Sequence, residues 1–519
     1  MSHKARSPLQ GMLERHLKSI LVAILAFMAW VAPAHALGTD RQSIANLRSE
    51  LRDFADFADD DANMYLPANV MLDQSSLRAF VGLGDFRVPS FGTGDTVNAL
   101  SAEFQMLDLR LALARLAQSY RSQDHLDIML AQDPDDLQAL VVRRGQITLS
   151  DIRRMLKRDY ENVTQSDDGT LVLHRPVIIW DDAKLVINPN EKLKFDRQSG
   201  AFLVNFGTLE ITGSHISTTL EPNADSPDFI PFVATAGGGN VLLTDTVVEG
   251  LGFGRTPKFS GFSVVRNPLV GRNQTNIFLN NVFVDIVSLA ISNASDSVIR
   301  SNRFHDMRAE GIALVRAPNT RILGNLFSGQ APTNSILVYN FSSNSRVSGN
   351  VLTRGDRAGI VVRNNSDNVL VSNNVVWRRD GGGIQMGRVT CGSVMDNLVM
   401  DNRQKGIEIR SADSVSVTRN LIIENHNAGV WVSAQVPDAQ THILENVLVK
   451  NGAGISSATG AILALKGNDF SEQFPRFLDG DLSFQSNYVV QDIYGRTPIV
   501  LTAAGPAPNA DLTGLDCEY

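Results

Sequence analysis

Four stretches of the chain follow one pattern: GIVVR at 359–363, GIQMG at 383–387, GIEIR at 406–410 and GVWVS at 429–433. Each stretch begins with glycine, and the residues one and three places after that glycine are apolar. Such alternation is typical of a β-strand that turns one face towards a core. Because the stretches begin 24, 23 and 23 residues apart, the sequence predicts one such strand in every repeat.

An asparagine marks the same place in successive repeats. It is followed by two mostly apolar residues, and its separations are 21, 23, 25, 24, 23, 23 and 26 residues. A repeat of this length, without a helix or a leucine framework, predicts a right-handed parallel β-helix. Stacked asparagine amides would then hydrogen-bond from coil to coil. We expect a structural ladder of Asn281, Asn302, Asn325, Asn350, Asn374, Asn397, Asn420 and Asn446.

Two sets of side chains are expected to fill the core of this solenoid. The first set comprises the fourteen apolar residues that stand one and three places after the small residue of seven repeats, from Ser288 to Gly429. The second set stands three places before each ladder asparagine, and every member is β-branched, as suits a narrow strand core. These residues are Ile299, Ile322, Val347, Val371, Val394, Val417 and Ile443.

We divide the chain into four segments. Residues 1–36 are a predicted signal peptide and 37–165 a mostly α-helical segment or cap. Residues 166–470 are the predicted parallel β-helix, and 471–519 form a C-terminal tail whose Pro-rich end is expected to be loose from Thr497. The fold class is therefore an all-β solenoid preceded by helices.

The helical segment is expected to pack on, or to cap, the β-helix. Apolar spacing predicts helices around 44–57 and 102–117, and a short basic helix from Ser150. The acidic residues between Asp53 and Asp61 are interpreted as a solvated helix face, because charge clusters on helices usually face water.

The first 36 residues have the features of an export signal. Four basic residues accompany an apolar run, Ile20 to Ala32, that is too short to span a bilayer comfortably. The triplet 34–36 matches a small-x-small cleavage site, which predicts cleavage after Ala36 and a periplasmic protein. An uncleaved membrane anchor is the alternative.

Composition argues against several classes of function. There are 55 acidic and 47 basic residues, a net charge of −8, so a strongly basic surface for nucleic acid is not expected. Two cysteines, Cys391 and Cys517, are too few for a disulfide-dense scaffold or a Cys-rich zinc module, although they can pair in an oxidising compartment. No HExxH, GxSxG or phosphate-loop motif occurs, and we expect neither a metal nor a cofactor.

The outward face of the repeated strand is the expected binding surface, because solenoids build sites from one position of successive coils. Between Arg300 and Arg419 there are sixteen basic and nine acidic residues. Arginine holds carboxylates bidentately and aromatic rings stack on sugars, so an extended anionic polysaccharide is the expected ligand. An ordinary exposed face, with Glu408 and Arg410 neutralising each other, is the alternative. The candidate residues are Arg316, Tyr339, Asn340, Arg363, Gln385, Arg388, Glu408, Arg410 and Trp431.

The start of the predicted β-helix resembles a known family. The runs at 174–179, 183–187 and 200–205, and the Gly-Ile-x-Val/Ile-Arg pattern at Gly359 and Gly406, are similar to periplasmic mannuronan C5-epimerases of alginate synthesis. The resemblance implies a periplasmic β-helix protein that modifies an anionic exopolysaccharide. It also implies, as partners, other periplasmic proteins of polysaccharide synthesis or export.

The similarity covers roughly residues 170–435, but the catalytic run of that family is absent. The family has Asp-Pro-His-Asp directly after Gly-Ile, whereas this chain has Ala-Leu-Val-Arg at 313–316, with Val315 in the place of the histidine. A family arginine one coil later corresponds to Asn340, while Arg410 matches a family position. The resemblance therefore implies either another set of catalytic residues or a non-catalytic relative.

Epimerisation and β-elimination of a uronan both begin with removal of H5 beside the carboxylate. That step needs a cation to neutralise the carboxylate and a base within hydrogen-bond reach. We expect Tyr339 to be the base, with Arg363 and Arg316 as neutralising cations, and His305 as the next candidate base. A scaffold that guides or protects a nascent polymer is the alternative. The expected substrate-binding residues are Arg410, Arg388, Glu408, Gln385, Trp431 and Asn340.

Overall fold

The computed structural model describes residues 40–81, 87–91, 102–119, 125–156, 163–254, 256–267, 269, 275–458, 462–506 and 517. The signal peptide predicted for residues 1–36 lies outside the described residues. Among the helices that are described, none is both long and apolar enough to cross a membrane.

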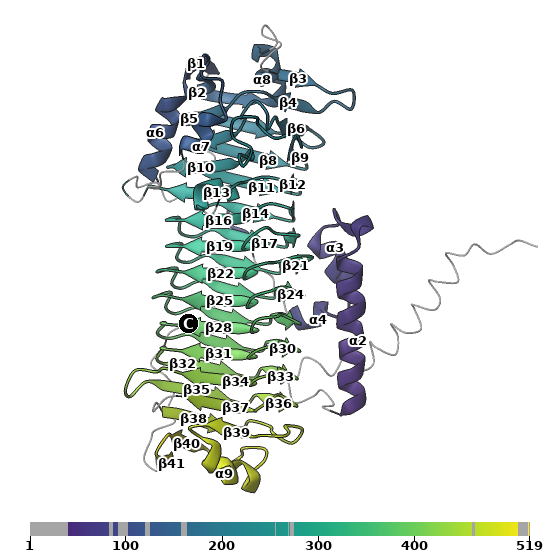
Figure 1. Cartoon of the computed structure of the whole chain (residues 1–519), viewed down its shortest axis with the longest axis vertical. Coiled ribbons are helices and arrows are strands. Elements are labelled where there is room, and N and C mark those ends of the chain that lie inside the picture. The colour runs from purple at the N-terminus through teal and green to yellow at the C-terminus, as the bar shows by residue number, and fades with distance from the viewer. Residues whose placement is uncertain are drawn as a thin grey trace, which may run out of the picture.

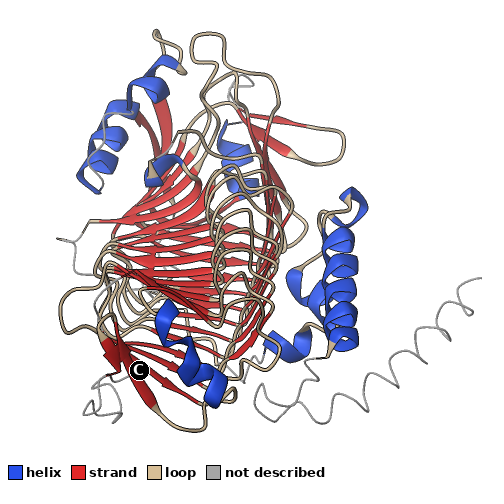
Figure 2. Ribbon diagram, turned by 60° about the horizontal axis from the view of Figure 1, so that its bottom comes forward, coloured by secondary structure: helices blue, strands red, loops and turns tan. Residues whose placement is uncertain are grey.

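Most of the chain winds into a β-solenoid of about twelve turns, whose three long sheets enclose one core (Figures 1 and 2). The first sheet contains β2 (Gln138–Thr148), β5 (Val177–Ile187), β7 (Leu203–Asn205), β10 (Val233–Gly237), β13 (Gly261–Arg266), β16 (Ser288–Ser292), β19 (Ile312–Val315), β22 (Ile336–Tyr339), β25 (Ile360–Arg363), β28 (Ile384–Gly387), β31 (Ile407–Arg410), β34 (Val430–Ser433), β37 (Ile455–Ala458) and β39 (Leu478–Gly480).

The second sheet shares the long strand β5 with the first. It continues with β8 (Thr208–Thr212), β11 (Asn240–Thr244), β14 (Ile277–Leu279), β17 (Val298–Arg300), β20 (Arg321–Leu323), β23 (Arg346–Ser348), β26 (Leu370–Ser372), β29 (Ser393–Met395), β32 (Val415–Thr418), β35 (Gln440–Leu444), β38 (Ile462–Lys466), β40 (Ile499–Thr502) and β41 (Gly505–Pro506).

The third sheet contains β3 (Val163–Gln165), β4 (Leu171–Leu173), β6 (Lys192–Phe195), β9 (His215–Thr218), β12 (Val247–Glu249), β15 (Val282–Val284), β18 (Arg303–His305), β21 (Leu326–Ser328), β24 (Val351–Leu352), β27 (Val375–Trp377), β30 (Leu398–Met400), β33 (Leu421–Ile423) and β36 (Val447–Val449). In all three sheets the strands of successive turns pair in parallel, apart from the terminal pairs β1–β2, where β1 spans Glu103–Asp108, β3–β4, β38–β40 and β40–β41. The parallel β-helix predicted from the repeat is confirmed.

Side-chain alternation fills the core as predicted. The fourteen apolar residues that follow the small residues are all at most 1 % exposed. The seven β-branched residues of the second sheet, from Ile299 to Ile443, are 0 % exposed. Because neighbouring turns pair without slippage, a one-residue error in register would have moved both sets to the surface.

The eight predicted asparagines form a continuous buried ladder. At each step Nδ2 of one asparagine donates to Oδ1 of the next, as from Asn374 to Asn397 at 2.9 Å. The backbone N–H of Asn374 donates to the same oxygen at 2.9 Å. The ladder continues to Asn468, and a second ladder that the sequence did not predict runs through Asn402, Asn425, Asn451 and Gln473.

The small residue at the start of each first-sheet strand has a steric cause. A Cβ added to Gly383 would lie 2.4 Å from Cγ1 of Val399 in the third sheet. At Gly406 it would lie 2.7 Å from the carbonyl oxygen of Gly429, one turn away. The third sheet and the neighbouring turn therefore exclude a side chain at these positions.

The N-terminal helices cover the outer face of the third sheet (Figure 1). Leu51 and Phe54 share a buried cluster with Trp377 and Met400 of that sheet. The expectation that the helical segment packs on the β-helix is confirmed. The elements concerned are α2 (Arg41–Ala58), η2 (Asp61–Asn63), α3 (Ala68–Asp73) and α4 (Arg78–Val81).

Two arginines on the solenoid hold the end of α2. Buried Arg303 donates hydrogen bonds to the carbonyl of Ala58 at 2.6 Å, and Arg354 forms ion pairs with Asp56 and Asp59. The acidic face of α2, predicted to be solvated, is therefore partly an attachment surface. The sequence did not indicate this, since the two charges are about 300 residues apart along the chain.

A second group of helices covers the outer face of the first sheet in its earliest turns (Figure 1). The outward residues Ile178, Val204 and Ala234 share a buried cluster with Leu113 and Phe259. These helices close the first sheet at one end. They comprise α6 (Leu109–Ser119), α7 (His125–Leu130) and η3 (Pro257–Phe259), while α8 (Leu149–Leu156) packs on β2 and β5.

The prediction of a helix over residues 102–117 is wrong for residues 103–108. Residues 103–108 form strand β1 (Glu103–Asp108), which pairs antiparallel with β2, and the helix begins at Leu109. The strong helix formers of this stretch favour a helix, but pairing with the exposed edge of β2 outweighs that propensity.

The C-terminal segment closes the other end of the solenoid. Leu482, Val489 and Leu501 join the main core, so the tail predicted to be loose from Thr497 contains an ordered strand, β40. Its apolar residues cover the last coil, which would otherwise expose a sheet edge. The closing elements also include η4 (Ser483–Gln485) and α9 (Ser486–Gln491). Cys517 is disulfide-bonded to Cys391, with the two Cα atoms 5.4 Å apart.

Candidate functional site

The outer face of the first sheet is open from β19 to β34, on the C-terminal side of the turns that α6 and η3 cover. It carries two rows of outward residues. What we call the arginine row consists of Val315, Tyr339, Arg363, Gly387, Arg410 and Ser433, which pair laterally across β19 to β34. The parallel glutamate row consists of Ala313, Leu337, Val361, Gln385, Glu408 and Trp431. Neighbours in a row are separated by about 4.8 Å. The structure therefore brings the predicted strand residues together in the predicted order.

Tyr339 and Arg363 form the most direct contact in the arginine row. Cζ of Arg363 lies 5.3 Å from the centroid of the Tyr339 ring, within the range of a cation–π interaction. Tyr339 is half-buried and Arg363 is exposed. The pair therefore places a phenol and a cation side by side on an accessible surface.

The predicted residues that follow the strands lie at the corner between the first and second sheets. Arg316, Asn340 and Arg388 have φ angles of 51°, 55° and 54°, which is the left-handed region. Asparagine adopts that region readily, whereas arginine does so at some cost. The backbone N–H of Arg316 donates to the carbonyl of Asn340 at 3.0 Å, so Arg316 adjoins Tyr339 across one turn.

Three arginines of this face lack acidic partners. Arg363, Arg388 and Arg410 are exposed, and within the described ranges of the chain their side chains form no ion pair. Several cations on the surrounding coils are paired with acids, as in Arg403–Asp380 at 3.3 Å. The open face therefore carries uncompensated positive charge.

Glu408 forms an ion pair with a residue that the sequence analysis missed. Its Oε1 lies 2.9 Å from Nζ of Lys405, and that ammonium lies 4.9 Å from the ring centroid of Trp431. The alternative in which Glu408 neutralises Arg410 is therefore wrong. Lys405 occupies the turn before β31, outside the strand positions that the alternation singles out, so the sequence pattern did not indicate it.

An exposed aromatic ring at the same corner was also missed. Phe341 is 56 % exposed and follows Asn340 in the turn after β22, with a φ angle of 65°. Its backbone N–H donates to the carbonyl of Asn364 one turn away. A bare ring at this place adds a surface on which a sugar can stack.

His305, the second candidate base, lies on another face of the solenoid. It belongs to β18 of the third sheet, is 1 % exposed, and its Nδ1 lies 3.0 Å from Oγ of Ser328. Burial, together with the nearby charge of Arg303, lowers the pKa of His305. A base there cannot reach a ligand on the arginine row; the His305 ring instead contacts Ser328 and Arg303, the arginine that holds the end of α2.

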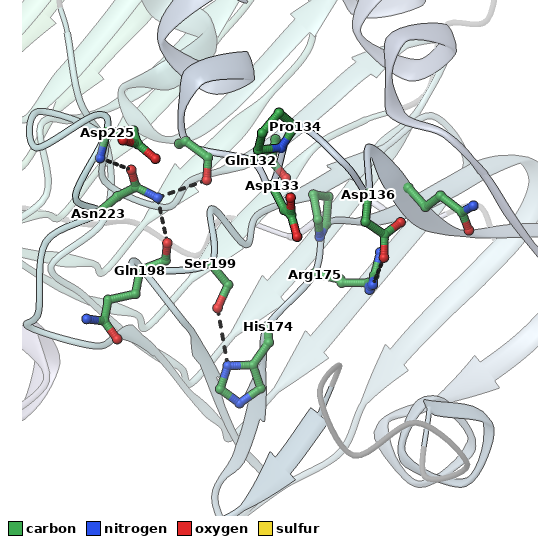
Figure 3. A pocket seen from close by; sticks show the side chains of 13 residues that line it. Gln132, Asp133, Pro134, Asp136, His174, Arg175, Gln198, Ser199, Asn223 and Asp225 are labelled. Carbon is green, nitrogen blue, oxygen red and sulfur yellow. Dashed lines mark hydrogen bonds and ion pairs between the residues drawn. The ribbon is translucent and has the colours of Figure 1, made fainter.

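A polar hollow of about 420 Å³ lies near the start of the solenoid (Figure 3). His174 borders it, with Nδ1 3.0 Å from Oδ2 of Asp196 and Nε2 2.9 Å from Oγ1 of Thr164. Burial opposes ionisation of Asp196, but hydrogen bonds from His174, Ser199 and Thr219 outweigh it and lower the pKa of Asp196. No residue of the two rows lines this hollow, so it is separate from the open face.

A family described as periplasmic copper-binding protein (NosD) matches residues 262–388 and 330–476. The two matches overlap, lie within the solenoid and cover less than half of the chain. Throughout the part of the chain that the structure describes, no group of three or more His, Cys, Asp or Glu residues is arranged to hold a metal ion.

Individual relatives point to one kind of protein. A mannuronan C5-epimerase of Pseudomonas syringae pv. tomato is 23% identical over 248 residues, which is 43% of this chain and 46% of that protein. A mannuronan C5-epimerase of Pseudomonas putida is 24% identical over 292 residues, or 54% and 56% of the two chains. This chain is a homologue of mannuronan C5-epimerases. The matched region spans about half the length of these two relatives.

The fold of this epimerase homologue matches a solved structure. The crystal structure of the periplasmic alginate epimerase AlgG superposes with a TM-score of 0.63 at 17% identity. The match covers 76% of this chain and 100% of that chain. At this identity the comparison establishes a shared β-solenoid fold.

Proposed function

We propose that this protein is a periplasmic enzyme that modifies an alginate-type uronan by removing H5 from a sugar. The contact between Tyr339 and Arg363 on an open, positively charged face carries the proposal. Its homology to mannuronan C5-epimerases supports the same class of substrate. An anionic exopolysaccharide fits a face whose arginines have no acidic partners among the described residues.

The proposed first step is proton transfer at C5. The phenolate oxygen of Tyr339 accepts H5, the C5–H bond breaks, and its electron pair spreads into the carboxylate. Arg363 neutralises the charge that develops there, and Arg316, whose backbone N–H contacts the turn that follows Tyr339, assists it. The cation matters because a carboxylate that keeps its full charge opposes formation of a second negative charge.

The product depends on the fate of that electron pair. Return of a proton to the opposite face of C5 forms a new C–H bond and gives the epimer. Expulsion of the glycosidic oxygen from C4 forms a C4–C5 double bond and gives a lyase product. The homology favours the epimer.

The remaining residues of the face are assigned to substrate binding. Arg388 and Arg410 contact carboxylates of the polymer, while Gln385 and Asn340 offer amides to sugar hydroxyls. Trp431 supplies an aromatic surface, one side of which is near Lys405. Other periplasmic proteins of polysaccharide synthesis or export are the proposed partners that deliver the polymer.

A non-catalytic scaffold is the second candidate function. It is favoured by the composition of the two rows, whose twelve described residues include no histidine and no aspartate. Val315, in particular, stands where the related family is expected to have its histidine. A protein of this kind would hold and guide the polymer with the same arginines and without proton transfer.

The two functions separate in one experiment. Purified protein is incubated with polymannuronate in D₂O, and anomeric proton NMR is recorded together with the ultraviolet absorbance of unsaturated sugars. New anomeric signals with deuterium at C5 identify an epimerase, and absorbance identifies a lyase. Binding of the polymer without either change identifies the scaffold, and absence of binding contradicts both proposals. N-terminal sequencing of the protein from a periplasmic fraction tests export and cleavage after Ala36.

A further inference from the structure

The imidazole of His174, at the border of the polar hollow, makes a hydrogen bond at each of its two nitrogens. Nδ1 lies 3.0 Å from Oδ2 of Asp196, and Nε2 lies 2.9 Å from Oγ1 of Thr164. The three side chains therefore form a line from carboxylate through imidazole to hydroxyl. An acid, a histidine and a hydroxyl nucleophile cooperate in this order in covalent catalysis.

Three neighbouring strands at the N-terminal end of the third sheet bring these side chains together (Figure 1). Thr164 belongs to β3, His174 directly follows β4, and Asp196 directly follows β6. β4 lies between the other two strands and pairs with both. The pairing of the sheet, and not a single turn, therefore sets the positions of the three groups.

The charge of Asp196 determines which nitrogen of His174 carries the proton. Burial opposes ionisation of Asp196, but hydrogen bonds from His174, Ser199 and Thr219 outweigh it and hold the pKa of that carboxyl well below its usual value. An ionised carboxylate can only accept hydrogen bonds, so Nδ1 of the neutral ring donates to it. Nε2 is then the acceptor, and the Thr164 hydroxyl donates to it.

The two ends of this line differ in exposure. Thr164 is exposed, whereas Asp196 is 8 % exposed. Lys194, which is half-buried, lies on the same lateral row as Thr164, with Val172 between them. Because neighbouring strands lie about 4.8 Å apart, the backbones at Thr164 and Lys194 are separated by roughly 9.6 Å. The hydroxyl is therefore open to a ligand, and a cation stands on the same face.

The adjoining hollow has a polar lining. His174 borders it together with Ser199, Gln198 and Asp225, and the last two are exposed (Figure 3). Its volume of about 420 Å³ is within the range of small-ligand sites. Amides, hydroxyls and carboxylates of this kind are suited to the hydroxyl groups of a sugar.

We propose that Thr164, His174 and Asp196 form the triad of an esterase that removes an acyl group from a sugar hydroxyl. Thr164 is the nucleophile, His174 is the general base and then the general acid, and Asp196 is a positioning residue that orients the imidazole. The site is on a different sheet from the arginine row. The inference therefore goes beyond the proposed function, and either can fail without the other.

The proposed reaction has two stages. The Thr164 hydroxyl gives its proton to Nε2 of His174, Oγ1 bonds to the acyl carbon, and the bond from that carbon to the sugar oxygen breaks. The sugar oxygen leaves with the proton from His174. A water molecule then gives a proton to His174 and bonds to the acyl carbon, and the Thr164 ester breaks. Oγ1 recovers its proton, and a carboxylic acid is released.

The first test measures ester hydrolysis by the full-length protein. The probes are 4-nitrophenyl acetate and O-acetylated polymannuronate, and the products measured are nitrophenolate and acetate. We expect both to be hydrolysed, and Thr164→Val and His174→Gln each to lower kcat at least about 100-fold. Thr164→Ser, which keeps a hydroxyl, should retain activity. Hydrolysis of neither ester, or full activity of Thr164→Val, overturns the proposal, and hydrolysis of 4-nitrophenyl acetate alone overturns the assignment to sugar esters.

A second histidine of the same sheet provides the matched control. His215 pairs with Glu249 through Nε2 at 3.0 Å, and in the described part of the chain no hydroxyl hydrogen-bonds to its ring. We expect His215→Gln to leave hydrolysis unchanged. A loss as large as that in His174→Gln would show that the effect is not specific to the triad.

The second test identifies the nucleophile. Diisopropyl fluorophosphate bonds to an activated hydroxyl and releases fluoride, and mass spectrometry of the digested protein locates the label. We expect the label on Thr164 of the unaltered protein and none on His174→Gln. A label on Ser199, or none at Thr164, overturns the assignment. Thr164→Val has nearly the shape of threonine at an exposed position, so its circular dichroism and melting temperature should match the unaltered protein and separate lost chemistry from lost folding.

Discussion

Arg363 lies with its guanidinium carbon 5.3 Å from the centre of the Tyr339 ring, and the two residues hold the same position in adjacent turns. The cation interacts with the ring, not with the hydroxyl at its edge. The Tyr339 ring therefore makes the contact with Arg363, and its hydroxyl is the group proposed to transfer the proton. A substitution that removes only the hydroxyl can test the second role without changing the first.

Tyr339→Phe keeps the ring and its contact with Arg363 but removes the phenolic oxygen. In an epimerase or lyase we expect turnover to be lost while the dissociation constant for polymannuronate changes little. Kinetics and calorimetry on the same preparation check both values. Tyr494→Phe is the matched control, because Arg496 lies 5.4 Å from that ring at the closed end of the solenoid. Full activity of Tyr339→Phe would show that another residue is the base.

Arg363→Ala and Arg410→Ala should each weaken polymer binding. Each removes a charge-assisted contact with a carboxylate, which corresponds to about 1.5–3 kcal/mol of binding free energy. Added salt should weaken binding by the unaltered protein more steeply than binding by either variant, because fewer ionic contacts remain to be screened. Titrations at several salt concentrations check this. Unchanged affinity in both variants would remove the arginine row from the binding surface.

Glu408→Gln should strengthen binding of an anionic polymer and make it more salt-dependent. The change removes a negative charge from the open face and releases Lys405, which Glu408 holds at 2.9 Å. Because the pair is only partly buried, we expect an effect of at most about 1 kcal/mol. The double variant Lys405→Met with Glu408→Gln should return the affinity towards its original value. Weaker binding by Glu408→Gln would indicate that the carboxylate itself contacts the ligand.

The fold and the order of the face residues were predictable because both follow from periodicity. The ladder from Asn281 to Asn446 and the arginine row depend on positions that recur in register, and a repeat exposes such positions directly. Lys405 and Phe341 were missed because they lie in turns, where no alternation marks an outward side chain. The contact of α2 with Arg354 joins residues about 300 positions apart, and no local pattern carries that information.

The disulfide between Cys391 and Cys517 should stabilise the C-terminal half of the solenoid. It joins residues 126 positions apart, and closing a loop of that length contributes up to about 4–5 kcal/mol in the chain-entropy view. We expect Cys391→Ala with Cys517→Ala to lower the melting temperature and to abolish its sensitivity to dithiothreitol. Thermal denaturation followed by circular dichroism, with and without the reductant, measures both effects. An unchanged melting temperature would show that the end cap holds without the bond.

His305 should make the attachment of the N-terminal helices sensitive to acid. Burial and the charge of Arg303 lower its pKa below the ordinary value of about 6.5, against the opposite effects of Asp306, Asp59 and Asp61. The contribution to stability is therefore complete above that ordinary value and is lost as the pH falls through the lower, folded-state pKa. In His305→Asn the stability should fall less between pH 7 and pH 5, as denaturant titrations can show. A parallel fall in both proteins would contradict this.

The helices that cover the first turns of the solenoid close one end of the open face. Ile178, Val204 and Ala234 continue the glutamate row towards the N-terminus, but α6 and η3 lie over them. A polymer that lay along the glutamate row would meet these helices. It would then have to end there or bend away from the axis of the solenoid. The face is therefore closed at one end by helices, so a polymer bound as we propose would have a fixed stopping point at that end.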